Sequence, residues 1–374
     1  MITAGPRCDI FCRVVDNFGD IGVTWRLARQ LSDEHRCQVR IIVDNLYSFQ
    51  KLVPQVVVAH GEVNEQLVGG VTVVEWREPF AALSPADLVI EAFGCELPET
   101  YIHAMTTMAH APVWINLEYL SAEPWVAEHQ LLPSPQSHYA LTKYFFFPGF
   151  ATGTGGLIRE KSAAVGSKAT RSTADNSPLK IFMFAYSDAP FSPLFAAMAE
   201  THKPICCGMS DAGFSTELKD KLKQWRGSQA ENALESALVL EFMPFVPQSE
   251  FDQILADHDI LFVRGEDSLV RAIWAARPFV WQIYPQSENA HMVKLSAFLD
   301  LYCVGLAAAA SAAMRELWRA WNTGDAATMP NAWRHYEQSL PELREHAARW
   351  SSQQSAMPDL ARNLLSFYQK TAKI

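Results

Sequence analysis

Two carboxylates and two glycines gather near the start of the chain, in the segment Asp16-Asn17-Phe18-Gly19-Asp20-Ile21-Gly22. The segment follows residues 10–15, which are apolar apart from Arg13, and precedes a helical pattern that begins near residue 23. Glycine lets a ligand approach the backbone closely, and a carboxylate can accept a proton from a substrate. A plain structural purpose fits equally well, because an aspartate often caps a helix. Both interpretations place Asp16 and Asp20 in a strand-to-helix loop.

A second acidic segment with a glycine, far downstream, favours the chemical interpretation. Arg264-Gly265-Glu266-Asp267-Ser268 follows the apolar residues 260–263 and opens a helical pattern over residues 267–276. Asp267 or Ser268 could simply cap that helix, and the first backbone N–H groups of the helix would also suit a phosphate; the two interpretations are compatible. Open parallel sheets bind ligands beyond the carboxyl ends of their strands, and both segments are predicted to lie there.

Aromatic and amide side chains that suit a planar base follow in a third segment. Phe245 and Phe251 flank Gln248, just before a helix predicted over residues 249–257. Stacking on an aromatic ring contributes about 1–3 kcal/mol per base, and an amide both donates and accepts hydrogen bonds. The two phenylalanines would also suit a protein core. Tyr186, after another predicted strand, is open to the same two interpretations.

The elements that must position these residues alternate strand and helix twice along the chain. Strands are predicted at 9–15, 38–44, 71–76, 87–93, 112–118, 179–185, 204–208, 238–243, 259–264 and 279–284, and helices at 23–35, 46–53, 98–109, 191–202, 214–225, 249–257, 267–276 and 290–300. The pattern predicts an α/β protein with two Rossmann-like halves. From about residue 312 the pattern is helical, with Trp318, Trp321 and Trp333 among the expected packing residues.

Domain boundaries follow from a change in composition. Residues 161–178 are poor in large apolar side chains and rich in Ser, Ala and Thr, which is typical of a linker or mobile loop. We therefore predict an N-terminal domain over 1–160 and a C-terminal domain over 179–345. Helices over 346–374 are expected to brace one domain against the other.

Composition and missing motifs exclude several classes of function. The net charge of −10 offers no footprint for nucleic acid or an anionic membrane. Neither half carries the GxGxxG or GxxxxGK[ST] pattern of dinucleotide and P-loop proteins, and the seven cysteines lack zinc-ligand spacing. We expect buried, reduced thiols and no metal. Since no signal-peptide or membrane-spanning pattern is found, a cytoplasmic protein is expected.

At these motifs the chain resembles the EarP family of bacterial protein-arginine rhamnosyltransferases, which modify the translation elongation factor EF-P. Besides the segments that begin at Asp16, Phe245 and Arg264, the resemblance rests on further motifs. These are Asn116-Leu117-Glu118-Tyr119-Leu120, Glu123-Pro124-Trp125, Phe147-Pro148-Gly149-Phe150 and Trp281-Gln282-Ile283-Tyr284-Pro285-Gln286. The resemblance implies a GT-B glycosyltransferase, with two Rossmann-like domains facing across a cleft.

The implied reaction transfers rhamnose from dTDP-β-L-rhamnose to a guanidino nitrogen of one EF-P arginine, with inversion and without metal or other cofactor. This modification would activate EF-P for the rescue of ribosomes stalled at polyproline. The C-terminal domain would mainly hold the nucleotide sugar, and the N-terminal domain the acceptor protein. A guanidinium, with a pKa above about 12, needs a carboxylate to orient it and to accept its proton.

The resemblance also implies roles for single residues. Asp20 is expected to be the base and Asp16 to position the guanidinium or the sugar, although the sequence leaves the division of these two roles open. Glu266 would pair with the acceptor arginine or hold the donor. The residues expected to bind the donor are Asn17, Phe18, Gly19, Tyr186, Phe245, Gln248, Phe251, Arg264, Asp267 and Ser268.

Two alternatives stay open at this point. Fold alone never determines substrate, so the chain could be a GT-B transferase with another nucleotide sugar or a small-molecule acceptor. It could also be a non-catalytic module that binds a translation factor. Against the module stands the full acidic set of Asp16, Asp20 and Glu266, which a protein without catalysis would be free to lose.

Overall fold

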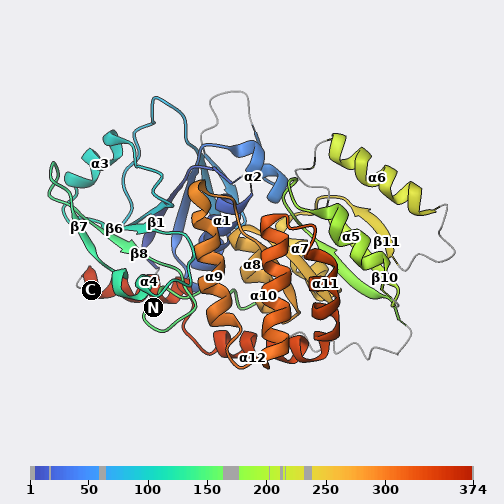
Figure 1. Cartoon of the computed structure of the whole chain (residues 1–374). Coiled ribbons are helices and arrows are strands. Elements are labelled where there is room, and N and C mark those ends of the chain that lie inside the picture. Colours follow the sequence, from blue (N-terminus) through green and yellow to red (C-terminus); the bar gives the residue numbers. More distant parts are fainter. Residues whose placement is uncertain are drawn as a thin grey trace. The chain divides into compact units, whose positions relative to one another are not determined.

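The computed structural model describes residues 5–16, 18–58, 65–162, 177–201, 203–210, 214, 216–230 and 238–372. The chain forms two compact units, each built around a sheet (Figure 1). The first unit combines Met1–Ala163 with Ser355–Ile374, and the second is Ala164–Gln354. Most of the predicted linker, residues 163–176, lies outside the described residues.

The first unit contains a mainly parallel sheet with the strand order β3-β4-β2-β1-β5-β6-β8-β7. The parallel strands are β1 (Arg7–Cys12), β2 (Gln38–Val43), β4 (Val71–Glu75), β5 (Leu88–Ala92), β6 (Val113–Leu117) and β8 (Thr142–Phe146). Two short antiparallel strands, β3 (Glu65–Val68) and β7 (Pro133–Pro135), close its edges. Because β1 is central, its side chains from Cys8 onward are buried on both faces.

One carboxylate inside this sheet is neutralised by an ion-pair network. Asp9 of β1 is buried and accepts hydrogen bonds from Arg40 Nε at 2.7 Å and Nη2 at 2.6 Å. The Ala86 N–H, at 3.1 Å, and the Tyr101 hydroxyl also donate to it. A buried charge with this many partners belongs to the structure of the sheet.

The helices of the first unit are α1 (Gly19–His35), α2 (Leu46–Leu52), α3 (Glu99–Thr106), α4 (Trp125–His129) and α13 (Leu360–Thr371). The C-terminal α13, red in Figure 1, packs against α1. Residues 346–374, predicted as helices that brace the two domains, are divided between the two units: α12 (Leu340–Ser355) lies almost wholly in the second unit and α13 in the first. The expected bracing of the domains stays a prediction.

The second unit contains a five-stranded sheet in the order β11-β10-β9-β12-β13, with every pairing parallel. Its strands are β9 (Leu179–Met183), β10 (Ile205–Ser210), β11 (Leu238–Met243), β12 (Ile260–Arg264) and β13 (Phe279–Gln282). Its helices are α5 (Phe191–Ala199), α6 (Thr216–Ala230), α7 (Gln248–Ala256), α8 (Gly265–Ala275), α9 (Ala290–Tyr302), α10 (Ala308–Thr323), α11 (Met329–Gln338) and α12, with a short 3₁₀ turn at Ser287–Asn289. Trp318, Trp321 and Trp333 are fully buried, as predicted.

Candidate functional site

The loop between β1 and α1 is shaped by one glycine. The Gly19 N–H donates to the Asp16 carbonyl at 2.6 Å, which closes a tight turn directly before the helix. A Cβ at position 19 would lie 2.6 Å from Asp16 Oδ2 and 3.1 Å from its carboxyl carbon. Any side chain there would push the Asp16 carboxylate away, so glycine is required for Asp16 to keep its place.

The Asp20 carboxylate points back toward this loop. Its Oδ2 accepts the backbone N–H groups of Val15 at 2.8 Å and of Asp16 at 2.9 Å, and the residue is 2% exposed. Phe18 stands at the N-cap of α1 and provides no side-chain cap. The capping prediction is therefore wrong for Asp20: its carboxylate secures the loop before α1 instead of the free N–H groups inside it.

Burial controls the electrostatics of Asp20. Loss of water around the carboxylate raises its pKa above the usual value, and the neighbouring charge of Asp16 adds to the increase. The two backbone N–H groups and the side-chain hydroxyl of Tyr119 oppose it by bonding to the charged form. A carboxylate with a raised pKa is a stronger general base than an exposed aspartate.

Neighbouring strands add residues at the same edge of the first sheet. Beyond β6, Tyr119 stacks on Phe93, which follows β5, with ring centroids 4.5 Å apart. Asn116, the fourth residue of β6, accepts the Gly94 N–H at 3.1 Å and donates to Glu118 Oε1 at 2.5 Å. The segments that follow β5 and β6 are thus joined to each other, at the same end of the parallel strands as the loop that holds Asp20.

Tyr119 and Phe93 were not predicted as site residues from the sequence. The motif that contains Tyr119 carried the family resemblance, and that was the available signal. Phe18, which was predicted to bind the donor, is half-buried, and Lys51 Nζ lies 6.0 Å from its ring centre. Asn17 lies outside the described residues. Donor binding by Asn17, Phe18 and Gly19 stays a prediction.

In the second unit, the turn from β12 to α8 rests on Gly265 and Ser268. Gly265 has φ +64°, a backbone conformation that favours glycine. The Ser268 hydroxyl accepts the Arg264 N–H at 3.1 Å and donates to the Arg264 carbonyl, which closes the turn. Ser268 is buried, and Glu266 and Asp267 in the first turn of α8 are half-buried.

Arg264 and Tyr186 meet, although the sequence separates them widely. The Arg264 guanidinium lies over the rings of Phe184, 4.5 Å from the centroid, and of Tyr186, at 4.6 Å. Its Nη1 donates to the Ala185 carbonyl at 3.3 Å. The Tyr186 backbone N–H donates to Gln282 Oε1 at 2.8 Å, which ties the end of β9 to the end of β13. Cation–π contact and burial therefore hold this positive charge at the carboxyl edge of the second sheet.

Gln248 and Asp267 also come together. Gln248 Nε2 donates to Asp267 Oδ2 at 3.0 Å, and Arg271 Nε donates to the same oxygen at 3.2 Å. Phe251 packs edge-on against Phe182 and Phe184, with centroids 5.7 and 5.5 Å apart. This contact agrees with the core interpretation of Phe251. Phe251 and Phe245 are both only half-buried, so surface remains on each for a ligand.

The described part of the chain shows no metal-binding cluster: no three of its His, Cys, Asp and Glu side chains are grouped to hold an ion. The cysteines at 8, 12, 37, 95, 206, 207 and 303 are free thiols, and all except the half-buried Cys206 are buried. Burial raises the pKa of the Cys8 and Cys12 thiols well above the usual value, which makes them poor nucleophiles. Among the helices that the structure describes, none is long and apolar enough to cross a membrane.

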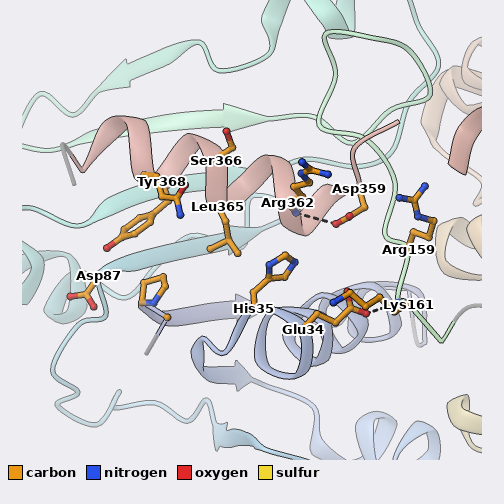
Figure 2. A pocket seen from close by; sticks show the side chains of 13 residues that line it. Glu34, His35, Asp87, Arg159, Lys161, Asp359, Arg362, Leu365, Ser366 and Tyr368 are labelled. Atoms are coloured by element: carbon orange, nitrogen blue, oxygen red, sulfur yellow. Dashed lines mark hydrogen bonds between the residues drawn. The ribbon is translucent and has the colours of Figure 1, made fainter. Parts of the chain in front are cut away.

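A cavity of about 1160 Å³ lies at the amino ends of the strands of the first sheet, opposite the Asp20 loop. There Pro6 precedes β1 and Asp87 precedes β5. In Figure 2, α13 lines one side of it and the end of α1, with His35, lines the other. Asp359 accepts the Arg362 N–H of α13 at 3.0 Å, so this carboxylate serves as a helix cap. Because ligands of parallel sheets bind at the carboxyl ends of the strands, we place the functional site at Asp20 instead.

Known proteins resemble this sequence over nearly its whole length. The sequence model of the family described as Elongation-Factor P (EF-P) rhamnosyltransferase EarP matches residues 8–369. A protein-arginine rhamnosyltransferase of Pseudomonas putida is 43% identical, over 97% of this chain and 98% of the relative.

Solved structures of other proteins share the fold of this chain. One, solved for the structural basis of EarP-mediated arginine glycosylation of translation elongation factor EF-P, is 31% identical and has a TM-score of 0.64, covering 98% of this chain and 99% of that one. A sucrose-phosphate synthase of Thermosynechococcus elongatus, 10% identical and covered to 98% in both chains, reaches a TM-score of 0.50. The predicted fold class, a GT-B glycosyltransferase, is confirmed.

Proposed function

Because this chain belongs to the EarP family of EF-P rhamnosyltransferases, we propose that it transfers L-rhamnose from dTDP-β-L-rhamnose to a guanidino nitrogen of one EF-P arginine, with inversion at the anomeric carbon. The observation that carries this proposal is the buried Asp20 carboxylate, held by two backbone N–H groups beside Asp16. The family relationship supports the sugar, the acceptor residue and the acceptor protein. The Asp20 loop supplies the group that such a reaction needs.

The acceptor guanidinium must lose a proton before or as it attacks. It is protonated at neutral pH and its nitrogen lone pairs are delocalised. In the proposed step a bond forms between a guanidino nitrogen and the anomeric carbon, while the bond from that carbon to the diphosphate oxygen breaks. Asp20 takes the released proton, and dTDP leaves with the electron pair. Asp16, beside it in the loop, holds the guanidinium through its negative charge.

The second unit supplies the proposed donor site. Phe245 and Phe251 hold the thymine by stacking, with Gln248 as hydrogen-bonding partner. Tyr186 and the first turn of α8, with Asp267 and Ser268, face the ribose and the diphosphate, and Arg264 balances the phosphate charge. The backbone N–H groups at the start of α8 stabilise the departing diphosphate without requiring a metal. Glu266 pairs with the acceptor arginine or holds the donor.

The experiment is intact-mass spectrometry of EF-P incubated with this protein and dTDP-β-L-rhamnose, followed by mapping of the modified residue. We expect one deoxyhexose on one arginine. Asp20→Asn should give no product while it binds the donor as tightly as the unaltered protein, measured by calorimetry. The control Asp33→Asn removes an exposed carboxylate of the same helix and should keep full activity.

Other outcomes would redirect the assignment. Donor binding without any mass change on EF-P would contradict the acceptor and point to a small-molecule transferase. Transfer from a UDP-sugar in preference to dTDP-rhamnose would contradict the donor. If the unaltered protein binds no nucleotide sugar but still binds EF-P, the chain is a non-catalytic module.

A further inference from the structure

The cavity between α1 and α13 has the size of a binding site for a small molecule. Its volume is about 1160 Å³, and residues of two helices of the first unit line it on facing sides (Figure 2). It lies at the amino ends of the strands, so the proposed transfer reaction uses none of its residues. What the cavity could hold follows from the side chains that line it.

Three cationic side chains line one end of the cavity: Arg159, Lys161 and Arg362. Figure 2 shows them near the start of α13. Arg159 Nη1 donates to the Ser355 carbonyl, which holds that guanidinium in place. In the described part of the chain, neither Lys161 Nζ nor the Arg362 guanidinium has a hydrogen bond or an ion pair. In a chain with a net charge of −10, such a group of cations is a local exception that favours an anionic ligand.

The carboxylates that line the same cavity already accept hydrogen bonds from the protein itself. Asp87 forms a two-point ion pair with Arg7, with nitrogen–oxygen distances of 2.9 and 3.3 Å. Gln30 Nε2 donates to Asp359 Oδ1 at 3.1 Å and to Glu34 Oε2 at 3.5 Å. These oxygens therefore have donors within the fold, whereas two of the three cations keep their N–H groups for a ligand.

Beyond the cations the lining becomes less polar. Leu365 of α13 and Pro6 before β1 line this part, and the His35 ring points from the end of α1 into the space beside α13 (Figure 2). His35 Nε2 is buried and has no hydrogen-bond partner among the described residues. A buried polar atom without a partner costs about 1–3 kcal/mol, so a ligand atom that bonds to Nε2 after a small rotation of the ring would be favoured.

We propose that this cavity binds a phosphate monoester with an apolar body. The phosphate lies among Arg159, Lys161 and Arg362, because guanidinium groups hold phosphate oxygens with two parallel hydrogen bonds. The body lies along Leu365, and His35 Nε2 supplies a polar contact beside it. This second site goes beyond the proposed transfer reaction and does not depend on it.

The test is the binding of phenyl phosphate and of inorganic phosphate, measured by calorimetry on the full chain in the presence of saturating dTDP. We expect Arg362→Gln to weaken the binding of phenyl phosphate about 10- to 100-fold, the range that corresponds to a hydrogen bond to a charged group. Lys370→Gln is the matched control, because this exposed lysine lies on the same helix but does not line the cavity. Equal binding by the unaltered protein and Arg362→Gln would overturn the proposal.

The two probes also separate an ester from free phosphate. Phenyl phosphate should bind more tightly than inorganic phosphate, because only the ester has a body that reaches Leu365. Equal affinity for the two probes would overturn the assignment of an apolar body, and binding of neither would overturn the site.

A second measurement locates the ligand. In protein labelled with ¹⁵N in the histidine rings, the His35 signal is identified by its loss in His35→Gln and then followed as phenyl phosphate is added. The signal should shift in the unaltered protein and in Lys370→Gln, at concentrations where Arg362→Gln shows no shift. If phenyl phosphate binds without moving the His35 signal, it occupies another place and the inference fails. Neither measurement requires that EF-P be modified, so this failure is distinct from a failure of the proposed function.

Discussion

Asp20 in its ionised form lowers the stability of the folded protein. Burial and the charge of Asp16 raise its pKa in the folded protein above the value near 3.8 that it has when exposed. Between these two values the folded state holds more protons than the unfolded state. The free energy of unfolding therefore decreases as the pH rises through this window, and it stays lower above it. A buried base is maintained at a cost to stability, as active sites often are.

Asp20→Asn should therefore be more stable than the unaltered protein at neutral pH. One oxygen of the carboxylate accepts both backbone N–H groups, so an asparagine oxygen can keep both while the charge is removed. Thermal unfolding followed by circular dichroism should give a higher Tm for the variant at pH 7. The difference should shrink toward the lower end of the window, where Asp20 is protonated in both states. A lower Tm at every pH would contradict this account of the residue.

The strand-to-helix loops were predictable because parallel strands place their carboxyl ends together, and the chain marks both loops with acids and glycine. The helix starts were less predictable. We expected helices from residues 23 and 267, whereas α1 begins at Gly19 and α8 at Gly265. Glycine is a poor helix former, so the pattern favours a loop at both positions. In the fold, a glycine is needed at both helix starts for another reason. Gly19 lies close to Asp16, and Gly265 has a positive φ.

Contacts between distant segments could not be predicted from the pattern. The stack of Tyr119 on Phe93 and the contact of Arg264 with Tyr186 join residues that lie far apart in the sequence. Three strands were also missed: β3, β7 and β8. The first two are short edge strands, and most of β8 is only half-buried, so none shows the continuous apolar run of an inner strand. What depends on local periodicity was predictable, and what depends on pairing in space was not.

Gly265→Ala tests the start of α8. An alanine at φ +64° costs about 1–2 kcal/mol, and relieving that strain moves the carbonyl that accepts Trp281 Nε1 at 2.8 Å. We expect both lower stability toward urea and weaker binding of dTDP-rhamnose by calorimetry. Gly324→Ala is the matched control, since Gly324 has φ +70° at the end of α10 with open space around it. Equal loss of binding in both variants would show that the effect is not local to α8.

The two units differ in how the chain builds them. The second is one continuous segment, Ala164–Gln354, whereas the first requires both ends of the chain. The final helix α13 is bound to it by the bond from the Leu360 N–H to the Leu157 carbonyl, at 2.9 Å, and by Asn363 Nδ2 to Gly155, at 3.0 Å. Leu360 and Leu364 are buried there. The first unit is therefore incomplete without the last residues of the sequence.

A chain that ends at residue 354 should keep a stable second unit and lose much of the stability of the first. Burying the two leucines of α13 is worth about 1.5–3 kcal/mol each, a large part of the roughly 5–15 kcal/mol that holds a domain together. Differential scanning calorimetry should show one transition moved to lower temperature and the other unchanged. A chain shortened only to Thr371 serves as control. Two unchanged transitions would contradict the assignment of α13 to the first unit.

The late arrival of α13 also sets an order for biosynthesis. Domains usually complete themselves from the N-terminus as the chain emerges. Here the first unit begins the chain but closes only when residues 355–374 have been made, so the second unit can be complete earlier. Until then Tyr144 and Phe146 of β8 lack the ring of Phe367, which packs on both in the finished protein. A nascent chain paused before α13 thus leaves this aromatic surface uncovered, in the same unit that holds the Asp20 loop.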